Sequence, residues 1–322
     1  MADMEYVNLG RLGVRVSRIC LGVAFRGQRD DDVAVRVIDR AIDLGCNFID
    51  CANFYGRGRS EDVLARAMRG KRDDLFITTK VWSRIGDGPN DAGLSRYHIM
   101  REVERSLTRL DTDRIDLYLL HNWDPHTPLD ESLRAMDDLV RQGKVLYTGA
   151  CNFTATQVVE AMWTADRLGL TPWACLQNQY NLLNRWEVEP ELLPLAGRHG
   201  LGLMTYSPLA IGLLSGRFRR GQIPPADSPW AQGHHDFDRA MSEQTDGVVQ
   251  SLIDVGTKHG KTPAQVAVAW LLTHPEVTAP MIGPDIPEHV EETFGALGWQ
   301  LPAEDIAVLD AASTVELPRR YT

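Results

Sequence analysis

The sequence predicts a (β/α)8 TIM barrel, a fold of the α/β class in which eight parallel strands close into a cylinder surrounded by helices. Short apolar runs alternate with amphipathic segments of helical length along almost the whole chain. This alternation is typical of parallel sheets, because helices provide the crossover connections. No Gly-x-Gly-x-x-Gly turn follows the first strand, which favours a closed barrel over an open doubly wound sheet. We expect residues 1–322 to form a single barrel domain.

The predicted elements follow one another in strand and helix pairs. The expected strands are Ile19–Leu21, Phe48–Asp50, Phe76–Lys80, Ile115–His121, Tyr147–Ala150, Cys175–Gln179, Gly202–Tyr206 and Pro280–Ile282. The expected helices are Asp32–Leu44, Ser60–Met68, Ser95–Leu110, Leu129–Gln142, Thr154–Leu168, Pro190–His199, Gln244–His259 and Pro287–Leu297. Ser60 and Glu61 suit the start of a helix, and Gly45, Gly169 and Gly200 suit left-handed helix ends.

Three segments fall outside the eight-fold pattern. Tyr6 to Val16 is expected to form a β-hairpin through Gly10, and Ala303 to Ala312 an extra C-terminal helix. Between them, Pro208 to Asp238 forms a long loop after the seventh strand. Loops at the C-terminal ends of barrel strands bear the active site, so we expect this loop to cover a cofactor or substrate.

The composition narrows the class of partner. A net charge of -10 without a Lys- or Arg-rich tract gives no reason to expect nucleic acid or an anionic membrane surface. No segment approaches the roughly 20 apolar residues that span a bilayer, and Met1 to Gly10 lacks an apolar signal region. The five cysteines are scattered, as is typical of reduced thiols in the cytoplasm. A small-molecule partner is therefore expected.

Four titratable residues stand at or just beyond the ends of predicted strands. They are Asp50, Tyr55, Lys80 and His121. Taken singly, such residues are more often solvated or structural than functional. The C-terminal ends of parallel strands meet at one end of a barrel, so together these side chains should converge on one small volume.

The same residues resemble those of the aldo-keto reductases. The match consists of Asn47-Phe48-Ile49-Asp50 followed by Tyr55-Gly56, then Ser60-Glu61, Thr79-Lys80 and Leu119-Leu120-His121. The segments Gly88-Pro89-Asn90-Asp91 and Gly93-Leu94-Ser95-Arg96 resemble the branch that contains potassium-channel β-subunits and many bacterial reductases. The resemblance covers nearly the whole chain.

This resemblance implies a catalytic tetrad and a reaction. Hydride would pass from a nicotinamide cofactor to an aldehyde or ketone, sugar-like compounds included, or in the reverse direction. Tyr55 would act as the general acid or base, and the Lys80 ammonium would lower its pKa. Asp50 would keep Lys80 protonated, and His121 would position the carbonyl oxygen.

The resemblance also implies a cofactor site. Asn152 and Gln179 would hold the carboxamide, Tyr206 would stack on the nicotinamide, and Ser207, Pro208 and Leu209 would lie near the pyrophosphate. Cys151 stands where relatives commonly have serine. The residues expected further along the cofactor are Gly212, Arg217, Gly283, Asp285, His289 and Glu292. Asp285 would repel a 2′-phosphate, whereas Arg217 and His289 would neutralise it, so NADP is expected and NAD stays open.

Phe54, Trp82 and Trp123 lie within a few residues of the tetrad and are expected to line an apolar substrate pocket.

Two other functions stay open. One is a slow-turnover, cofactor-binding regulatory protein of the same fold. The other is a metal-dependent barrel using Asp50 and His121, which the lack of a dense ligand set and the nearby Lys80 disfavour, so no metal is expected.

Overall fold

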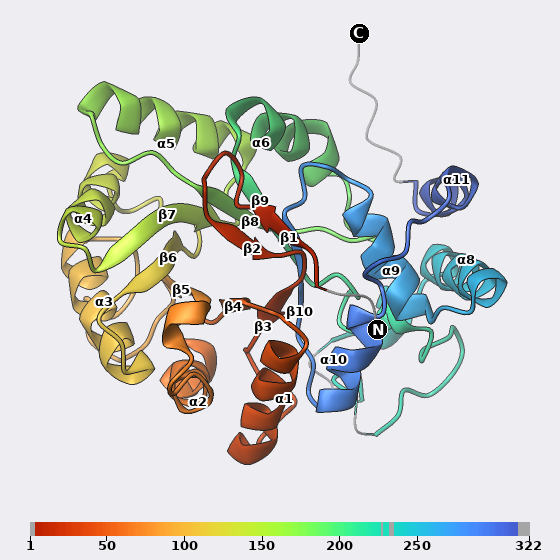
Figure 1. The fold of residues 1–322 in the computed structure, drawn as a ribbon. Coiled ribbons are helices and arrows are strands. Elements are labelled where there is room, and N and C mark those ends of the chain that lie inside the picture. Colours follow the sequence, from red (N-terminus) through yellow and green to blue (C-terminus); the bar gives the residue numbers. More distant parts are fainter. Residues whose placement is uncertain (1–3, 227, 232–234, 315–322) are drawn as a thin grey trace, which may run out of the picture.

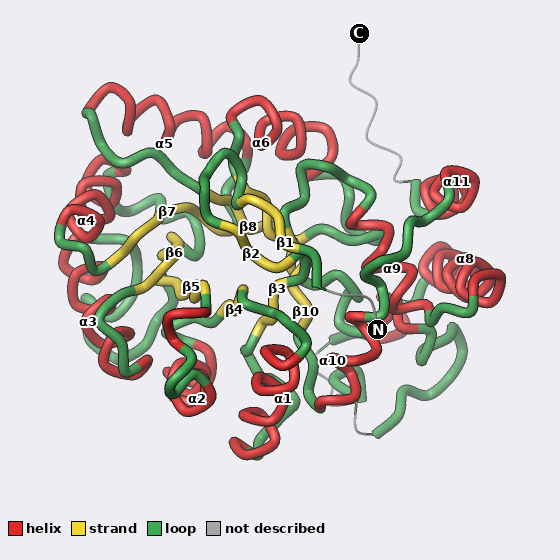
Figure 2. The backbone as a smooth tube through the Cα atoms, in the orientation of Figure 1, coloured by secondary structure: helices red, strands yellow, loops and turns green. Residues whose placement is uncertain are grey.

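A computed structural model describes residues 4–226, 228–231 and 235–314 of the chain. Eight parallel strands close into a barrel, surrounded by helices (Figures 1 and 2). In barrel order the strands are β10 (Ala279–Ile282), β3 (Cys20–Gly22), β4 (Phe48–Asp50), β5 (Phe76–Val81), β6 (Ile115–Leu120), β7 (Val145–Cys151), β8 (Cys175–Gln179) and β9 (Gly202–Tyr206). The predicted fold class is confirmed.

The helices in the first part of the chain follow the predicted pattern closely. Those before β9 are α1 (Asp31–Asp43), α2 (Arg59–Ala67), α3 (Arg96–Leu110), α4 (Leu129–Arg141), α5 (Ala155–Leu168) and α6 (Leu193–His199). Those after β9 are α7 (Phe237–Ala240), α8 (Glu243–His259), α9 (Pro263–Leu272), α10 (Pro287–Phe294) and α11 (Ala303–Ala312). The predicted C-terminal helix is thus present, with its bounds confirmed.

Alternation along the strands divides the core into two layers. In β6, Leu117 and Leu119 belong to the cluster inside the barrel, whereas Tyr118 and Leu120 belong to the larger cluster between the sheet and the helices. Side chains two residues apart share a face of a strand, so each strand contributes to both layers. The last inward-facing residues of the strands therefore lie at the C-terminal end of the barrel.

The N-terminal hairpin closes the opposite end of the barrel. Strands β1 (Tyr6–Asn8) and β2 (Arg15–Ser17) pair antiparallel and lie across the barrel end that faces the viewer in Figure 1. Leu9 and Val16 are fully buried and join the inner cluster. The turn packs closely against the start of β9, since a Cβ on Gly10 would lie 2.4 Å from the Gly200 carbonyl oxygen. The predicted hairpin is therefore confirmed, and it acts as a plug.

The sequence did not predict two helices, the short α7, which begins at the end of the predicted Pro208–Asp238 loop, and α9. The helix predicted at Gln244–His259 exists as α8, but it packs between α9 and α11, and it is α9 that packs against β10 (Figure 1). Nearly all of α9 is buried, so it lacks the polar face that marks an amphipathic helix. The sequence did contain a signal for the start of this helix. Thr262 and Gln265 form a capping box, and Pro263 occupies the first helical position.

Two predicted helix starts differ in detail. Ser60 does not cap α2; its hydroxyl donates to the Val23 carbonyl oxygen at 2.7 Å, while α2 begins after Gly58 without a side-chain cap. The helix predicted from Pro190 contains a π-helical turn, Val188–Leu192, before α6. Pro190 and Pro194 both lack the N–H that a regular α-helical ladder requires, which accounts for the irregular turn. The left-handed residues expected at Gly45, Gly169 and Gly200 are confirmed.

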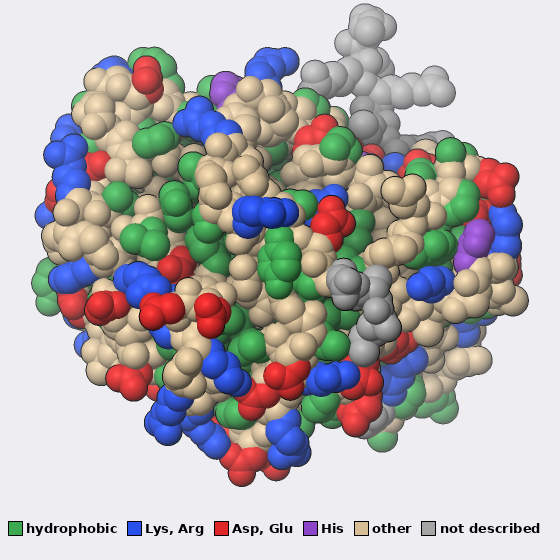
Figure 3. Space-filling view, viewed as in Figure 1, with side chains coloured by type: hydrophobic (Ala, Val, Ile, Leu, Met, Phe, Trp, Pro, Cys, Tyr) green, Lys and Arg blue, Asp and Glu red, His purple; other side chains and the backbone are tan. Residues whose placement is uncertain are grey.

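Charged side chains of both signs are interspersed around the hairpin face (Figure 3). Many form surface ion pairs, such as Arg40 with Glu291 and Lys258 with Glu304. Within the described part of the chain, no helix is long and apolar enough to cross a membrane.

Candidate active site

A buried ion pair lies at the C-terminal end of the barrel. Asp50 ends β4 and Lys80 lies near the end of β5, both on the inward face, and the two side chains are fully buried. The Lys80 Nζ lies 2.5 Å from Asp50 Oδ2 and donates to the Cys51 carbonyl oxygen at 2.7 Å. Two carbonyl or carboxylate acceptors thus hold the ammonium group in one orientation.

Tyr55 lies in the short helical turn Tyr55–Gly58 that follows β4. Gly56 and Arg57 adopt left-handed conformations at φ 58° and 57°, which turns the chain sharply before α2 begins. The Lys80 ammonium donates to the Tyr55 hydroxyl at 3.4 Å and lies 4.9 Å from the ring centroid. Asp50, Lys80 and Tyr55 therefore form a continuous chain from carboxylate to phenol, as the sequence predicted.

Burial and neighbouring charges have opposing effects on the pKa values in this chain. Burial raises the pKa of Tyr55, and the Lys80 ammonium opposes that rise without cancelling it. The lowering effect expected of Lys80 is thus present, but burial has the larger effect on the pKa of Tyr55. Burial alone would lower the pKa of Lys80, but Asp50, Tyr55 and Cys151 together raise it by more, so the ammonium stays charged.

His121 completes the group. It follows β6 directly, and its ring lies edge-on to Tyr55 with centroids 5.8 Å apart. Burial, together with the positive charges of Lys80 and Arg26, lowers the pKa of His121 to about 2. The imidazole is thus neutral at physiological pH, with one N–H donor and one acceptor nitrogen. Its Nδ1 is buried and has no hydrogen-bond partner among the described residues.

Gln177 is a site residue that the sequence analysis missed. Its side-chain amide in β8 donates to Asp50 Oδ1 at 2.9 Å, and its oxygen accepts from the Cys151 thiol at 3.4 Å. Burial raises the pKa of Cys151 to about 12, so this group is a neutral thiol. Strand alternation places Gln177 on the same face as Gln179, and this was the signal that could have identified it.

Two of the expected carboxamide-binding residues lie beside the tetrad. Asn152 adopts a left-handed conformation at φ 60°. Its amide donates to the His121 carbonyl oxygen at 3.1 Å, and its oxygen accepts from the Tyr206 hydroxyl at 2.7 Å. Asn152 does not cap α5, because Thr154 forms that cap with Gln157. Gln179 ends β8 opposite Tyr206 in β9. Tyr206 is half-buried.

The backbone after β9 is contorted. Ser207, Ala210 and Ile211 all have positive φ angles between 48° and 57°, and Gly212 follows at 86°. Such conformations cost about 1–3 kcal/mol each for residues with a side chain and concentrate at functional sites. Pro208 is buried and Leu209 half-buried within this turn, whereas Arg217 lies further out and is exposed. This turn suits the close approach of a phosphate group to the backbone.

The second segment that is expected to bind the cofactor follows β10. Gly283 is exposed, and Asp285 is half-buried against the loop after β3, where Gln28 donates to the Asp285 carbonyl oxygen at 2.9 Å. Burial raises the pKa of Asp285, against the effects of His289 and a hydrogen bond from the Gly27 backbone. Helix α10, which contains His289 and Glu292, begins after Ile286 without a side-chain cap. The first turn of α10 contains the acidic Glu288.

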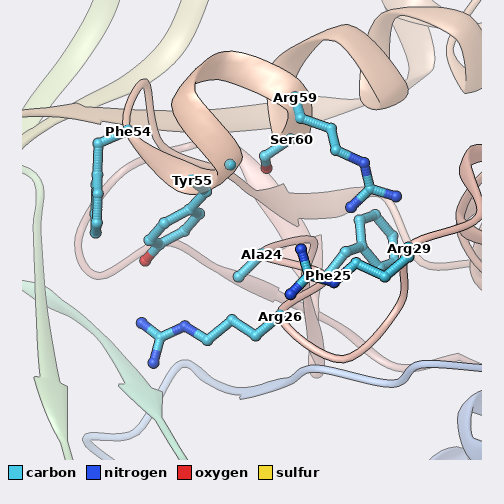
Figure 4. Close-up of a pocket in the computed structure, with 9 residues that line it drawn as sticks. Ala24, Phe25, Arg26, Arg29, Phe54, Tyr55, Arg59 and Ser60 are labelled. Atoms are coloured by element: carbon cyan, nitrogen blue, oxygen red, sulfur yellow. The ribbon is translucent and has the colours of Figure 1, made fainter. Parts of the chain in front are cut away.

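A pocket of about 470 Å³ opens beside Tyr55 (Figure 4). Its lining residues are Ala24, Phe25, Arg26, Arg29, Phe54, Tyr55, Gly56, Arg59 and Ser60. Phe54 also contacts His121, with ring centroids 5.3 Å apart. Trp82 and Trp123 follow β5 and β6 and pack partly buried against the outer core, outside this lining. Their place in a substrate pocket stays a prediction.

The described residues offer no candidate ligand set for the metal-dependent alternative. Within the described residues, no three His, Cys, Asp or Glu side chains lie close enough together to hold a metal ion. Asp50, the central carboxylate of that hypothesis, is already bound by Lys80 and Gln177.

Comparisons with known proteins identify the family. The model of the aldo/keto reductase family matches residues 18–314, and the chain belongs to this family. It is 39% identical over 302 residues to a probable voltage-gated potassium channel subunit beta of Oryza sativa subsp. japonica, covering 91% of each chain. It is 38% identical over 319 residues to the uncharacterized oxidoreductase YrpG of Bacillus subtilis, covering 95% of each. The predicted branch of the family is thereby confirmed.

Proposed function

We propose that this protein reduces an aldehyde or ketone to an alcohol with NADPH, using Tyr55 as the proton donor. Family membership already identifies it as an oxidoreductase of carbonyl compounds that uses a nicotinamide cofactor. The observation that supports the finer assignment is the buried chain from Asp50 through Lys80 to the Tyr55 hydroxyl. The same groups would serve alcohol oxidation in the reverse direction.

Each residue of the site has a defined part in this proposal. When bound, the nicotinamide supplies the hydride. A carbonyl oxygen held by the neutral His121 imidazole lies within reach of the Tyr55 hydroxyl, which donates its proton as negative charge develops on that oxygen. Lys80 stabilises the resulting phenolate, and Asp50 and Gln177 hold Lys80 in place. Proton donation of this kind contributes roughly 10²–10⁴-fold to the rate.

The proposed cofactor site extends from the barrel mouth over two neighbouring segments. Asn152, Gln179 and Tyr206 would bind the nicotinamide end, and the turn Ser207 to Gly212 would approach the pyrophosphate. The segment from Gly283 to Glu292, with Arg217, would hold the adenosine end. NADP is favoured because Arg217 and His289 would offset the Asp285 carboxylate, which accepts a hydrogen bond from the Gly27 backbone and interacts with His289.

The test is the reduction of an aromatic aldehyde followed at 340 nm with NADPH and, separately, with NADH. We expect Tyr55→Phe to lower kcat at least 100-fold. Tyr97→Phe, which alters a tyrosine with a 63% exposed side chain, is the matched control and should retain full activity. Wild-type activity that survives in Tyr55→Phe would refute the proton-donor assignment. A lower KM for NADH than for NADPH would refute the NADP assignment.

A slow-turnover regulatory protein is the second candidate, favoured by the similarity to two plant proteins named as potassium channel β-subunits. The two functions differ in rate rather than in fold. Tight cofactor binding by fluorescence, with turnover far slower than once per second on a broad panel of carbonyl compounds, would favour the regulator.

A further inference from the structure

We propose that Arg26 binds an anionic group on the carbonyl substrate, so that the enzyme prefers aldehydes or ketones bearing a carboxylate or phosphate. This inference rests on the proposed function. Arg26 follows β3 and lines the pocket beside Tyr55. Figure 4 shows its side chain extending across the pocket to the side where the Tyr55 hydroxyl lies.

The pocket is strongly cationic. Three of its lining residues, Arg26, Arg29 and Arg59, are basic, and none is acidic. Arg59 is already engaged, because its Nε lies 2.6 Å from Asp31 Oδ1 and its Nη1 donates to the Gln28 carbonyl oxygen. Within the described residues, Arg26 and Arg29 make no hydrogen bond or ion pair. Their positive charge is therefore available to a ligand.

Of the three arginines, Arg26 is the one whose charge acts on His121 and Tyr206. It contributes to the lowered pKa of His121, and it opposes the rise in the pKa of Tyr206. The positive charge of Lys80 is balanced by Asp50. Glu187 has the opposite effect to Arg26 and raises the pKa of Tyr206. A substrate whose carbonyl lies between Tyr55 and His121 would place a neighbouring anionic group within the field of Arg26.

The chemistry of a guanidinium group suits this role. Its planar set of N–H donors binds carboxylate and phosphate oxygens in pairs, and a partly desolvated pocket strengthens the attraction. Arg26 itself is exposed, so it does not incur the cost of a buried unpaired charge. The anionic group takes no part in hydride or proton transfer and serves only to hold the substrate.

The test compares 4-carboxybenzaldehyde with its neutral methyl ester, methyl 4-formylbenzoate. We expect the wild type to show a higher kcat/KM for the acid, and Arg26→Gln to lower the acid-to-ester ratio about tenfold or more. Arg26→Lys should restore part of the ratio, and raising KCl from about 20 to about 300 mM should reduce it. Arg36→Gln, on an exposed position of α1, makes the same change in net charge and should leave the ratio unaltered.

Two further measurements separate the possible failures. Binding of the product 4-(hydroxymethyl)benzoate and of its methyl ester, measured by calorimetry, needs no turnover, so a preference for the anion that depends on Arg26 supports the inference even if reduction fails. Equal binding of the two compounds, or a preference unaltered in Arg26→Gln, overturns it. An unaltered ratio with a raised Kd for NADPH would instead show that Arg26 holds the cofactor's phosphates.

Discussion

The side-chain amide of Gln177 donates to Oδ1 of Asp50 at 2.9 Å, while Lys80 binds the other oxygen of the same carboxylate at 2.5 Å. Asp50 is fully buried, so its two oxygens have no access to water. Each partner consequently fixes one side of the carboxylate, and together they fix the position of the Lys80 ammonium beside Tyr55.

Replacing Gln177 should impair catalysis without removing any member of the tetrad. Gln177→Leu leaves Asp50 Oδ1 without a donor, and a buried unpaired oxygen costs about 1–3 kcal/mol. We expect kcat to fall roughly fivefold to 100-fold. Gln179→Leu provides the comparison. We propose that Gln179 binds the cofactor, so this variant should raise the Kd for NADPH instead. Unchanged kcat in Gln177→Leu would show that Lys80 alone orients Asp50.

Breaking the buried ion pair should destabilise the fold and also lower the activity. Lys80→Met leaves the Asp50 charge buried without its cation, which we expect to lower the free energy of unfolding by about 3–5 kcal/mol. Urea unfolding followed by circular dichroism measures this change. The double variant Asp50→Asn with Lys80→Met removes both charges and should be more stable than Lys80→Met alone. A double variant no more stable than the single one would contradict this account of the pair.

The pH dependence of reduction should reflect Tyr55 and not His121. Reduction requires protonated Tyr55, whose pKa burial raises above its ordinary value near 10. Protonated phenol is therefore fully present at neutral pH and is lost only as the pH rises through that elevated pKa. Because the pKa of His121 is lowered to about 2, its ionisation should not appear between pH 5 and 9. We expect kcat/KM for the aldehyde to be flat over this range; an inflection near pH 6.5 would indicate that His121 titrates.

The turn of the N-terminal hairpin offers a test of the plug. A Cβ on Gly10 would lie 2.4 Å from the Gly200 carbonyl oxygen, and the backbone there has a φ of 56°. We expect Gly10→Ala to lower the free energy of unfolding by about 3 kcal/mol, from steric overlap and left-handed strain. Gly13→Ala, where nothing lies within 4 Å, is the matched control and should be nearly neutral. Equal stability of the two variants would mean that the hairpin moves away from β9 at little cost.

The sequence alone determined the barrel, the hairpin and the convergence of Asp50, Tyr55, Lys80 and His121. These follow from local signals: apolar periodicity separates strands from helices, and parallel strands bring their C-terminal ends to one side. The same signals did not reveal α9, because a helix buried on nearly every side has no polar face. They also did not distinguish Gln177 from other polar residues of β8, because its role depends on Asp50, which lies 127 residues away in the chain.

The electrostatics of the site depend on how the chain packs in three dimensions. Whether burial or Lys80 dominates the pKa of Tyr55 depends on how completely the surrounding chain excludes water, which no spacing of residues encodes. The neutral state of His121 likewise follows from burial and from the positive charges of Lys80 and Arg26. The position of Arg26 beside Tyr55 depends on the loop after β3 meeting the turn after β4. Local sequence therefore defined which groups are present, and packing across the barrel defined their charge and their neighbours.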